Sequence, residues 1–174
     1  MRFVELSDDL VVAMTPVEES DAPALVRMIN EPLPHMVMGR EPRSLADVAA
    51  LIRHWRRGDH VVFAIRNGPE VMSELLGCVG LFDIRHVDRN AEFRIFLAKD
   101  ARGHGVGLAA TRFAVEYGFT DLGLHRIWLG VQAENAPAIG CYQKAGFQRE
   151  GVLRDETWIG GRFVDTVRMS ILQS

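Results

Sequence analysis

Glycines alternate in one short segment of the chain, where the sequence RGHGVG covers residues 102–107. Three glycines in such close succession, Gly103, Gly105 and Gly107, indicate a backbone that bends sharply or lies close to another group. A helical pattern begins at about Gly107, and free main-chain N–H groups at the beginning of a helix attract anions. The segment therefore predicts a turn that binds phosphate, and the alternative is a strand-to-helix turn that binds no ligand.

Two common phosphate-binding motifs do not fit this segment. The nucleoside-triphosphate loop requires G-x-x-x-x-G-K-[ST], and that spacing does not occur in the sequence. A dinucleotide motif can be placed on Gly105, Gly107 and Ala110, but it should follow its strand immediately, and here the residues KDAR intervene. Fewer than 70 residues follow Ala110, which is too short for the remaining units of a dinucleotide-binding fold. The pattern therefore argues against a nicotinamide-dependent oxidoreductase.

A mixed arrangement of strands and helices has to position this turn. Ser44 and Asp47 form a looser version of the capping box, and Asn135 and Pro137 open a short helix that Gly146 closes. The predicted strands are 10–17, 60–65, 75–84, 91–98 and 126–131 with a closing hairpin over 154–172, and the predicted helices cover 21–30, 44–57, 107–122 and 135–146. The sequence predicts an α/β or α+β protein that forms one domain over residues 1–174.

Composition and charge narrow the class of protein. The chain has 174 residues, 48% hydrophobic and 25% charged, and no apolar run approaches the roughly 20 residues of a membrane helix. A net charge of −3 argues against a general nucleic-acid-binding protein. Cys78 and Cys141 are too few for a disulfide framework, and without an export signal we expect a cytoplasmic protein. The six histidines are scattered, so we expect no metal site.

Two motifs in the second half of the chain resemble one enzyme family. Arg102-x-x-Gly105-x-Gly107, between a strand and a helix, resembles the acetyl-CoA pyrophosphate loop of the GNAT superfamily of N-acetyltransferases. The segment NAPAIGCYQKAGF is similar to the family's N-x-x-[AS]-x-x-x-Y-x-K-x-G-F signature, with matches at Asn135, Ala138, Tyr142, Lys144, Gly146 and Phe147. The resemblance covers about 75–172. HVDRNAEFRIFLA and the tail VRMSIL are also similar to bacterial spermidine N-acetyltransferases and to ribosomal-protein N-terminal acetyltransferases.

The resemblance implies a fold and a way of holding a co-substrate. The fold is a central mixed, mostly antiparallel sheet flanked by helices, and acetyl passes directly from acetyl-CoA to a primary amine. The pantetheine arm lies between two strands that separate, beside the main chain of Ile95, Phe96 and Leu97, and one of these amides also steadies the oxyanion. The remaining cofactor-binding residues that it implies are Arg102, Gly103, His104, Gly105, Val106, Gly107, Leu108, Asn135, Ala138 and Lys144.

The same resemblance assigns the proton transfers. Tyr142 is implied as the general acid, because a phenol stays protonated at neutral pH and can donate to the departing thiolate; the alternative is a packed aromatic side chain. Glu92 is implied as the general base for the substrate ammonium, directly or through water. The alternative is a strand carboxylate paired with Arg94 or Arg126. Cys141 is expected to be a small buried residue rather than a nucleophile.

The acceptor amine is less well defined. We expect its specificity to lie around 31–60 and in the 82–90 turn, with Glu41 and Asp83 as candidate substrate-binding acids. Arginines flank Glu41, so a polyamine such as spermidine stays open beside a protein N-terminus, an amino sugar, an aminoglycoside or an amino acid. A sensor that binds acetyl-CoA without turnover is a remote alternative. The family implies a homodimer or a larger homo-oligomer.

Three aromatic residues are either part of the acceptor pocket or part of the core. They are Trp55, Trp158 and Phe163. Because large aromatic side chains are mostly buried, the expected place for all three is the core.

Overall fold

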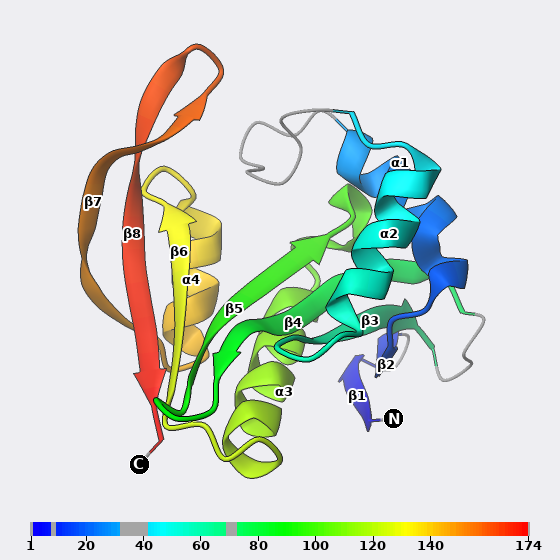
Figure 1. Cartoon of the computed structure of the whole chain (residues 1–174), viewed down its shortest axis with the longest axis horizontal. Coiled ribbons are helices and arrows are strands. Elements are labelled where there is room, and N and C mark those ends of the chain that lie inside the picture. Colours follow the sequence, from blue (N-terminus) through cyan, green and yellow to red (C-terminus); the bar gives the residue numbers. More distant parts are fainter. Residues whose placement is uncertain (1, 8–9, 32–41, 69–72, 174) are drawn as a thin grey trace.

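One eight-stranded sheet runs through the molecule (Figure 1), with the strand order β1-β2-β3-β4-β5-β6-β8-β7. The computed structural model describes residues 2–7, 10–31, 42–68 and 73–173. The pairing of β5 with β6 is parallel, and the six other pairings are antiparallel. The predicted mixed, mostly antiparallel sheet is therefore confirmed.

The predicted elements are present, and one strand precedes them. The strands are β1 Arg2–Ser7, β2 Leu10–Pro16, β3 Val61–Asn67, β4 Leu75–Arg85, β5 Asn90–Leu97, β6 Arg126–Gln132, β7 Gln148–Ile159 and β8 Arg162–Leu172. The helices are α1 Ala22–Asn30, α2 Leu45–Trp55, α3 Val106–Thr120 and α4 Ala136–Lys144, with 3-10 turns η1 Glu19–Asp21 and η2 Lys99–Ala101. The prediction did not include β1, because six residues near a chain end carry too short an alternation to stand out.

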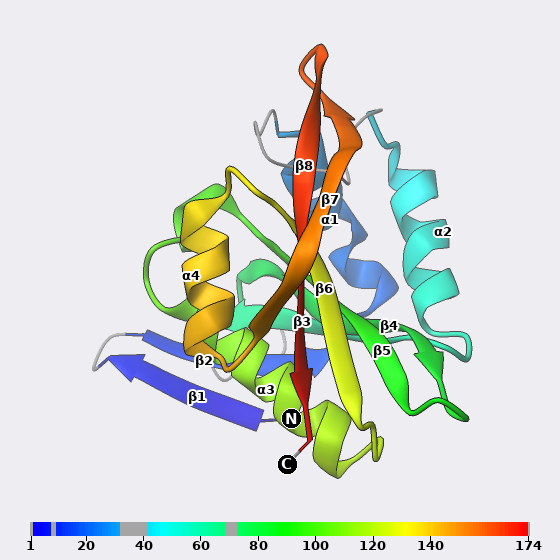
Figure 2. The same ribbon diagram turned by 90° about the vertical axis from the view of Figure 1, so that its left-hand side faces the viewer.

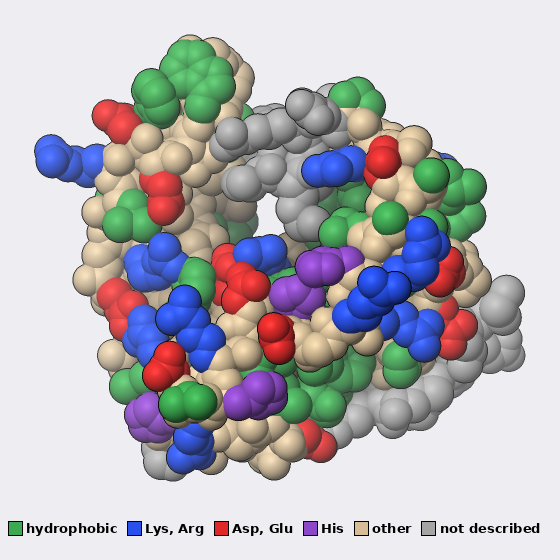
Figure 3. All heavy atoms as spheres, in the orientation of Figure 1, with side chains coloured by type: hydrophobic (Ala, Val, Ile, Leu, Met, Phe, Trp, Pro, Cys, Tyr) green, Lys and Arg blue, Asp and Glu red, His purple; other side chains and the backbone are tan. Residues whose placement is uncertain are grey.

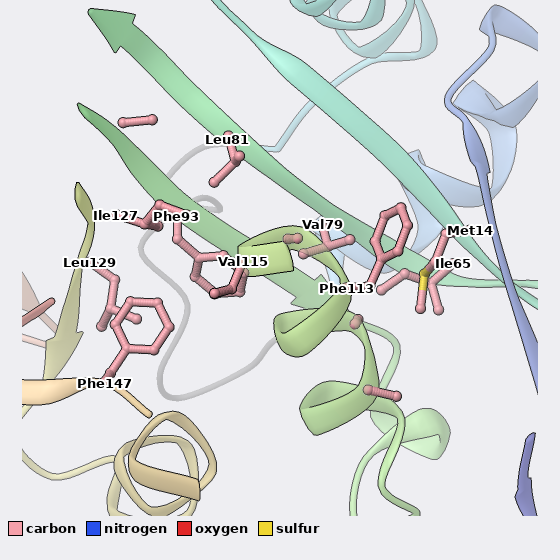
Figure 4. Packing of buried hydrophobic residues seen from close by; sticks show 14 of the residues in the cluster. Met14, Ile65, Val79, Leu81, Phe93, Phe113, Val115, Ile127, Leu129 and Phe147 are labelled. Atoms are coloured by element: carbon pink, nitrogen blue, oxygen red, sulfur yellow. The ribbon is translucent and has the colours of Figure 1, made fainter. Parts of the chain in front are cut away.

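Helices cover both faces of the sheet (Figure 2). On one face α3 and α4 pack on a core that includes Val79, Phe113 and Ile127 (Figure 4). On the other face α1 and α2 bury a second core, in which Ile52 and Trp55 contact the sheet. Trp55 therefore lies in the core as expected. No helix within the described residues has the length and apolar character that a membrane crossing requires.

The end of the β7–β8 hairpin differs from the expectation. Trp158 and Phe163 are 50% and 56% exposed, and their rings pack edge to face with centroids 4.8 Å apart. The hairpin extends beyond the layer of helices (Figure 1), so these side chains cover each other rather than enter the core. The expectation that both residues are buried was wrong.

Helix termini follow the predicted signals. The Ser44 hydroxyl accepts a hydrogen bond from the Asp47 amide, and the Asp47 carboxylate accepts one from the Ser44 amide. Asn135 caps α4 by accepting a hydrogen bond from the Ala138 amide at 3.2 Å. Gly146 follows α4 with φ of +102°, a conformation that favours glycine. These caps fix where α2 and α4 begin and end.

Candidate active site

The strands β5 and β6 separate in the middle of the sheet. They pair over Asn90–Arg126, Ala91–Ile127 and Glu92–Trp128, and beyond these pairs they diverge (Figure 1). A cavity of about 560 Å³ lies at the divergence. It is lined by Glu92, Phe93, Arg94, Ile95, Phe96, Trp128, Leu129, Gly130, Val131, Gln132, Asn135, Tyr142, Glu156, Thr157, Thr166 and Arg168. We refer to it as the gap cavity.

The main chain of β5 faces this gap at alternate residues. The guanidinium of Arg102 donates to the Leu97 carbonyl at 2.8 and 3.2 Å, whereas the Ala98 amide donates to Leu76 at the end of β4. Because backbone groups of successive strand residues alternate in direction, Ile95 and Leu97 face away from β4 and Phe96 faces toward it. Of the three predicted pantetheine contacts, Ile95 and Leu97 have their main-chain groups on the gap side.

The glycine segment forms the turn between β5 and α3. Gly103 and Gly105 both have φ of +84°, in the left-handed region, and Gly105 is the N-cap of α3. A Cβ on Gly103 would meet nothing within 4 Å, whereas one on Gly107 would lie 3.4 Å from Leu97 and 3.8 Å from Cys141. The turn therefore presents the amides at the start of α3 with open space beside Gly103, which fits a phosphate group.

Other predicted cofactor residues surround this turn. Val106 and Leu108 lie in the first turn of α3, and the Lys144 carbonyl accepts a hydrogen bond from Arg112 of α3 at 3.2 Å. The Ala138 amide donates to the Asn135 cap, while Asn135 also lines the gap cavity. His104 instead lines a second cavity of about 720 Å³ between α1 and the segment that precedes α3.

Tyr142 reaches the gap cavity from α4. Its ring packs edge to face on Phe93 with centroids 5.8 Å apart and lies 6.0 Å from the ring of Phe147. Burial raises the pKa of the Tyr142 phenol, so the hydroxyl is protonated at neutral pH. Burial also raises the pKa of the neighbouring Cys141 thiol, which disfavours a thiolate nucleophile.

Glu92 lines the same cavity and forms an ion pair. Arg94 Nη2 lies 2.6 Å from Glu92 and 3.6 Å from Asp83, so the guanidinium contacts two carboxylates. The other proposed partner, Arg126, pairs with Glu150 instead. The structure thus shows the paired carboxylate and also places that carboxylate in the gap cavity with Tyr142.

Of the two candidate substrate-binding acids, the structure describes Asp83 but not Glu41. Asp83 lies at an irregular point of β4 with φ of +50°, and its carboxylate faces Arg94. Glu41 lies outside the described residues. Within the described part of the chain, no three histidine, cysteine or acidic side chains are placed to hold a metal ion.

The residues that β6, β7 and β8 contribute to the lining of the gap cavity were not predicted from the sequence. Trp128 lies beside Glu92 in the sheet register. The guanidinium of Arg168 lies over the Trp128 ring, 4.3 Å from the ring centroid. The apolar run of β6 concealed this face, although strand alternation groups Trp128 with Gly130 and Gln132. Figure 3 shows a hollow between the β7–β8 hairpin and the α1–α2 layer, with acidic, basic and histidine side chains gathered on its floor.

Comparison with known proteins gives one family. The sequence family described as Acetyltransferase (GNAT) domain matches residues 12–148. The spermidine N(1)-acetyltransferase of Vibrio cholerae is 41% identical over 105 residues, which are 60% of this chain and 61% of that protein's length. YdaF of Bacillus subtilis, named for a proposed ribosomal N-acetyltransferase activity, is 29% identical over 162 residues, 90% of this chain and 88% of its own.

Solved structures of the Vibrio cholerae enzyme have the same fold. Its complex with CoA and spermine superposes with a TM-score of 0.84 at 31% identity, over 93% of this chain and 95% of that chain. A dodecameric structure of the same enzyme gives a TM-score of 0.80 at 32% identity, with 94% of both chains covered.

Proposed function

The chain belongs to the GNAT acetyltransferase family, and from that premise we propose that it transfers acetyl from acetyl-CoA to a primary amine within a ternary complex. The observation that carries the proposal is the gap cavity. There the diverging strands and the Tyr142 side chain meet, and the left-handed glycine turn adjoins the end of β5, where Arg102 donates to the Leu97 carbonyl.

We propose that the co-substrate lies across the gap from the β5 main chain to the glycine turn. The main-chain groups of Ile95 and the Leu97 N–H suit the amides of a pantetheine arm, because the edge of a strand binds extended chains by main-chain hydrogen bonds. The amides of Gly105, Val106 and Gly107 suit a pyrophosphate at the positive end of α3. Acetyl-CoA supplies the reactive thioester, and the protein holds that thioester in position.

Proton transfer follows from the two ionisable groups of the cavity. Glu92, directly or through water, first takes a proton from the substrate ammonium, and the lone pair of the resulting amine then attacks the thioester carbon. A main-chain N–H of β5 donates to the developing oxyanion. When the carbon–sulfur bond breaks, the sulfur takes the proton of the Tyr142 hydroxyl, whose raised pKa keeps it available. The nitrogen loses its second proton to the Tyr142 oxygen, so the products are the acetamide and free CoA thiol, with one proton left on Glu92 for release to solvent.

For the acceptor we propose a polyamine such as spermidine. Support comes from the names of the similar Vibrio cholerae enzyme and of its complex with spermine. The carboxylates of Glu92 and Asp83 add negative charge beside the gap, although Arg94 offsets part of it.

Release of CoA thiol from acetyl-CoA tests the proposal when spermidine, an N-terminal ribosomal peptide, an amino sugar and an aminoglycoside are supplied in parallel. We expect turnover with spermidine, and turnover with another class alone would contradict the acceptor. Thermal unfolding with acetyl-CoA and with NADH is the companion measurement. No shift with acetyl-CoA would contradict the binding site itself, and binding without any turnover would support a sensor.

We also propose that the chain forms a homo-oligomer. The dodecameric relative supports this, and so does the exposed Trp158–Phe163 pair, because large exposed aromatic groups commonly mark contact surfaces. Light scattering with multi-angle detection measures the mass directly. A mass of one chain across micromolar concentrations would contradict the proposal.

A further inference from the structure

A chain of polar contacts leads from α2 to Glu92 on the acceptor side of the sheet. His54 Nε2 and His60 Nε2 are 3.2 Å apart, and the Asp83 amide donates to His60 Nδ1 at 3.2 Å. The Asp83 carboxylate in turn lies 3.6 Å from Arg94, which pairs with Glu92. Histidines and charged side chains share the floor of the hollow (Figure 3).

These contacts fix the tautomer of His60. Because Nδ1 accepts from the Asp83 amide, the ring proton is on Nε2, and this N–H donates to His54 Nε2. Phe82 packs against the other side of this arrangement, with its ring 5.4 Å from that of His60 and 4.9 Å from the Arg94 guanidinium. His60 therefore has a defined orientation relative to β4.

Asp83 needs such a partner. It has φ of +50° at a point where the β4–β5 register shifts, a conformation that is uncommon for non-glycine residues although aspartate tolerates it better than most, and hydrogen bonds from neighbouring segments help to hold it. The neighbouring Ile84 amide is also held, by the Asp59 carbonyl at 3.0 Å. The segment 59–60 thus holds the irregular part of β4 from outside the sheet.

The position of Asp83 affects the carboxylate of Glu92, because Arg94 contacts both side chains. The Arg94 guanidinium occupies Oε2 of Glu92 at 2.6 Å and therefore competes with a substrate ammonium for this carboxylate. Asp83 shares the Arg94 guanidinium, so Arg94 is not committed to Glu92 alone. If Asp83 were displaced, the Arg94 guanidinium would pair with the Glu92 carboxylate alone.

We infer that His60 is a positioning residue for the acceptor side of the site: it holds Asp83, and through Asp83 it sets how strongly Arg94 engages Glu92. The inference rests on the proposed function, in which Glu92 takes the ammonium proton. His54 holds the His60 ring in turn.

Three variants and a control test the inference. In His60→Ala the acceptor for the Asp83 amide is lost, whereas in His60→Asn the side-chain oxygen replaces Nδ1. Asp83→Asn removes the charge, and asparagine tolerates left-handed φ. His125→Ala, at an exposed histidine before β6, is the matched control.

We expect kcat/KM for the amine to fall about 10-fold in His60→Ala and Asp83→Asn, with KM for acetyl-CoA within twofold of the parent. His60→Asn should recover to within about threefold of the parent, and His125→Ala should equal it. Equal loss in His60→Ala and His60→Asn, or a parallel rise in KM for acetyl-CoA, would overturn the inference.

A measurement without turnover separates the two proposals. Nitrogen-15 NMR of the imidazoles should find His60 protonated at Nε2 only, and the Asp83 amide signal should move in His60→Ala but not in His60→Asn. A His60 ring protonated at Nδ1 overturns the inference even in an active enzyme. A parent protein that acetylates no amine contradicts the proposed function, whatever the tautomer.

Discussion

Tyr142 and Glu92 show two ways in which a tertiary environment prepares an ionisable group. Tyr142 is surrounded by Phe93 and Phe147, and its burial raises the pKa of the phenol. Glu92 instead faces a guanidinium that is shared with Asp83. The first environment keeps the phenol protonated at neutral pH, whereas the second places the proposed base beside a guanidinium and a second carboxylate.

Replacing Tyr142 with phenylalanine should lower kcat on the order of 100-fold, because the thiolate would leave without a proton donor. The edge-to-face contact with Phe93 should survive, so the acetyl-CoA-dependent rise in melting temperature should be unchanged. Since the pKa is raised above its ordinary value of 10.0, the tyrosine should not limit the parent rate as the pH rises from 7 to about 10. Steady-state thiol release over that range checks both expectations; an unchanged kcat in the variant would remove Tyr142 from the mechanism.

At the scale of elements, the turn between β5 and α3 joins the two halves of the proposed cofactor site. Arg102 ties the turn to the end of β5 through the Leu97 carbonyl. Gly103 and Gly105 give the backbone its left-handed φ, whereas Gly107 lies within α3 against Leu97 and Cys141. The three glycines therefore serve two purposes, which their even spacing does not reveal.

Gly103→Ala should weaken acetyl-CoA binding at least 10-fold, because its methyl group enters the open space beside the turn. The strain of left-handed φ should also cost about 1 kcal/mol of stability. Gly123→Ala is the matched control, since Gly123 also has positive φ and open space but lies between α3 and β6. Titration calorimetry and urea unfolding should show equal destabilisation in the two variants and lost binding in the first alone. Equal binding in both would count against a phosphate at this turn.

The β7–β8 hairpin is tied to the sheet by Glu150, which accepts hydrogen bonds from Arg126 of β6 and Ser170 of β8. These bonds, led by those from Arg126, lower the pKa of Glu150 from 4.5 to about 2. A lowered pKa in the folded state means that the contribution to stability is full above about pH 5 and is lost as the pH falls toward 2.

Glu150→Gln should therefore reduce the free energy of unfolding at pH 7, by less than about 1 kcal/mol because the carboxylate is partly exposed. The difference from the parent should shrink as the pH is lowered from 5 to 3. Urea unfolding at pH 7, 5, 4 and 3 measures the difference. A gap that stays constant over this range would contradict the role of the charge.

At the scale of the whole molecule, one buried ion pair joins the α1–α2 layer to the sheet. Asp21 before α1 accepts two hydrogen bonds from Arg66 of β3, and Arg66 also donates to Thr15 of β2. Both charged side chains are 6% exposed. Their separation would leave a buried charge without a partner.

Asp21→Ala should destabilise the protein by about 3–5 kcal/mol, because Arg66 would stay buried and unpaired. Glu19→Ala, which breaks the half-exposed Glu19–Arg53 pair two residues away, should cost less than about 1 kcal/mol. Chemical denaturation compares the two variants. Similar losses would mean that the Asp21–Arg66 pair does not hold the layer.

The sequence by itself determined the local elements and contains the motifs on which the proposed cofactor side of the site rests. Helical spacing, strand alternation and caps such as Ser44 and Asn135 are short-range signals, so they locate the helices and most strands. The glycine turn and the motif around Tyr142 also lie within continuous segments, which makes their types and spacing readable.

Only the tertiary structure decided which distant residues meet. The parallel β5–β6 pairing ends at Glu92 and Trp128, and this register opens the gap that no local pattern encodes. Three further features depend on strand order in the sheet. They are the pairing of Glu92 with Arg94 rather than Arg126, the exposure of Trp158 and the contact of Arg168 with Trp128. The contact of Arg168 with Trp128 joins residues far apart in the chain, and the packing of whole elements, rather than any local preference, brings them together.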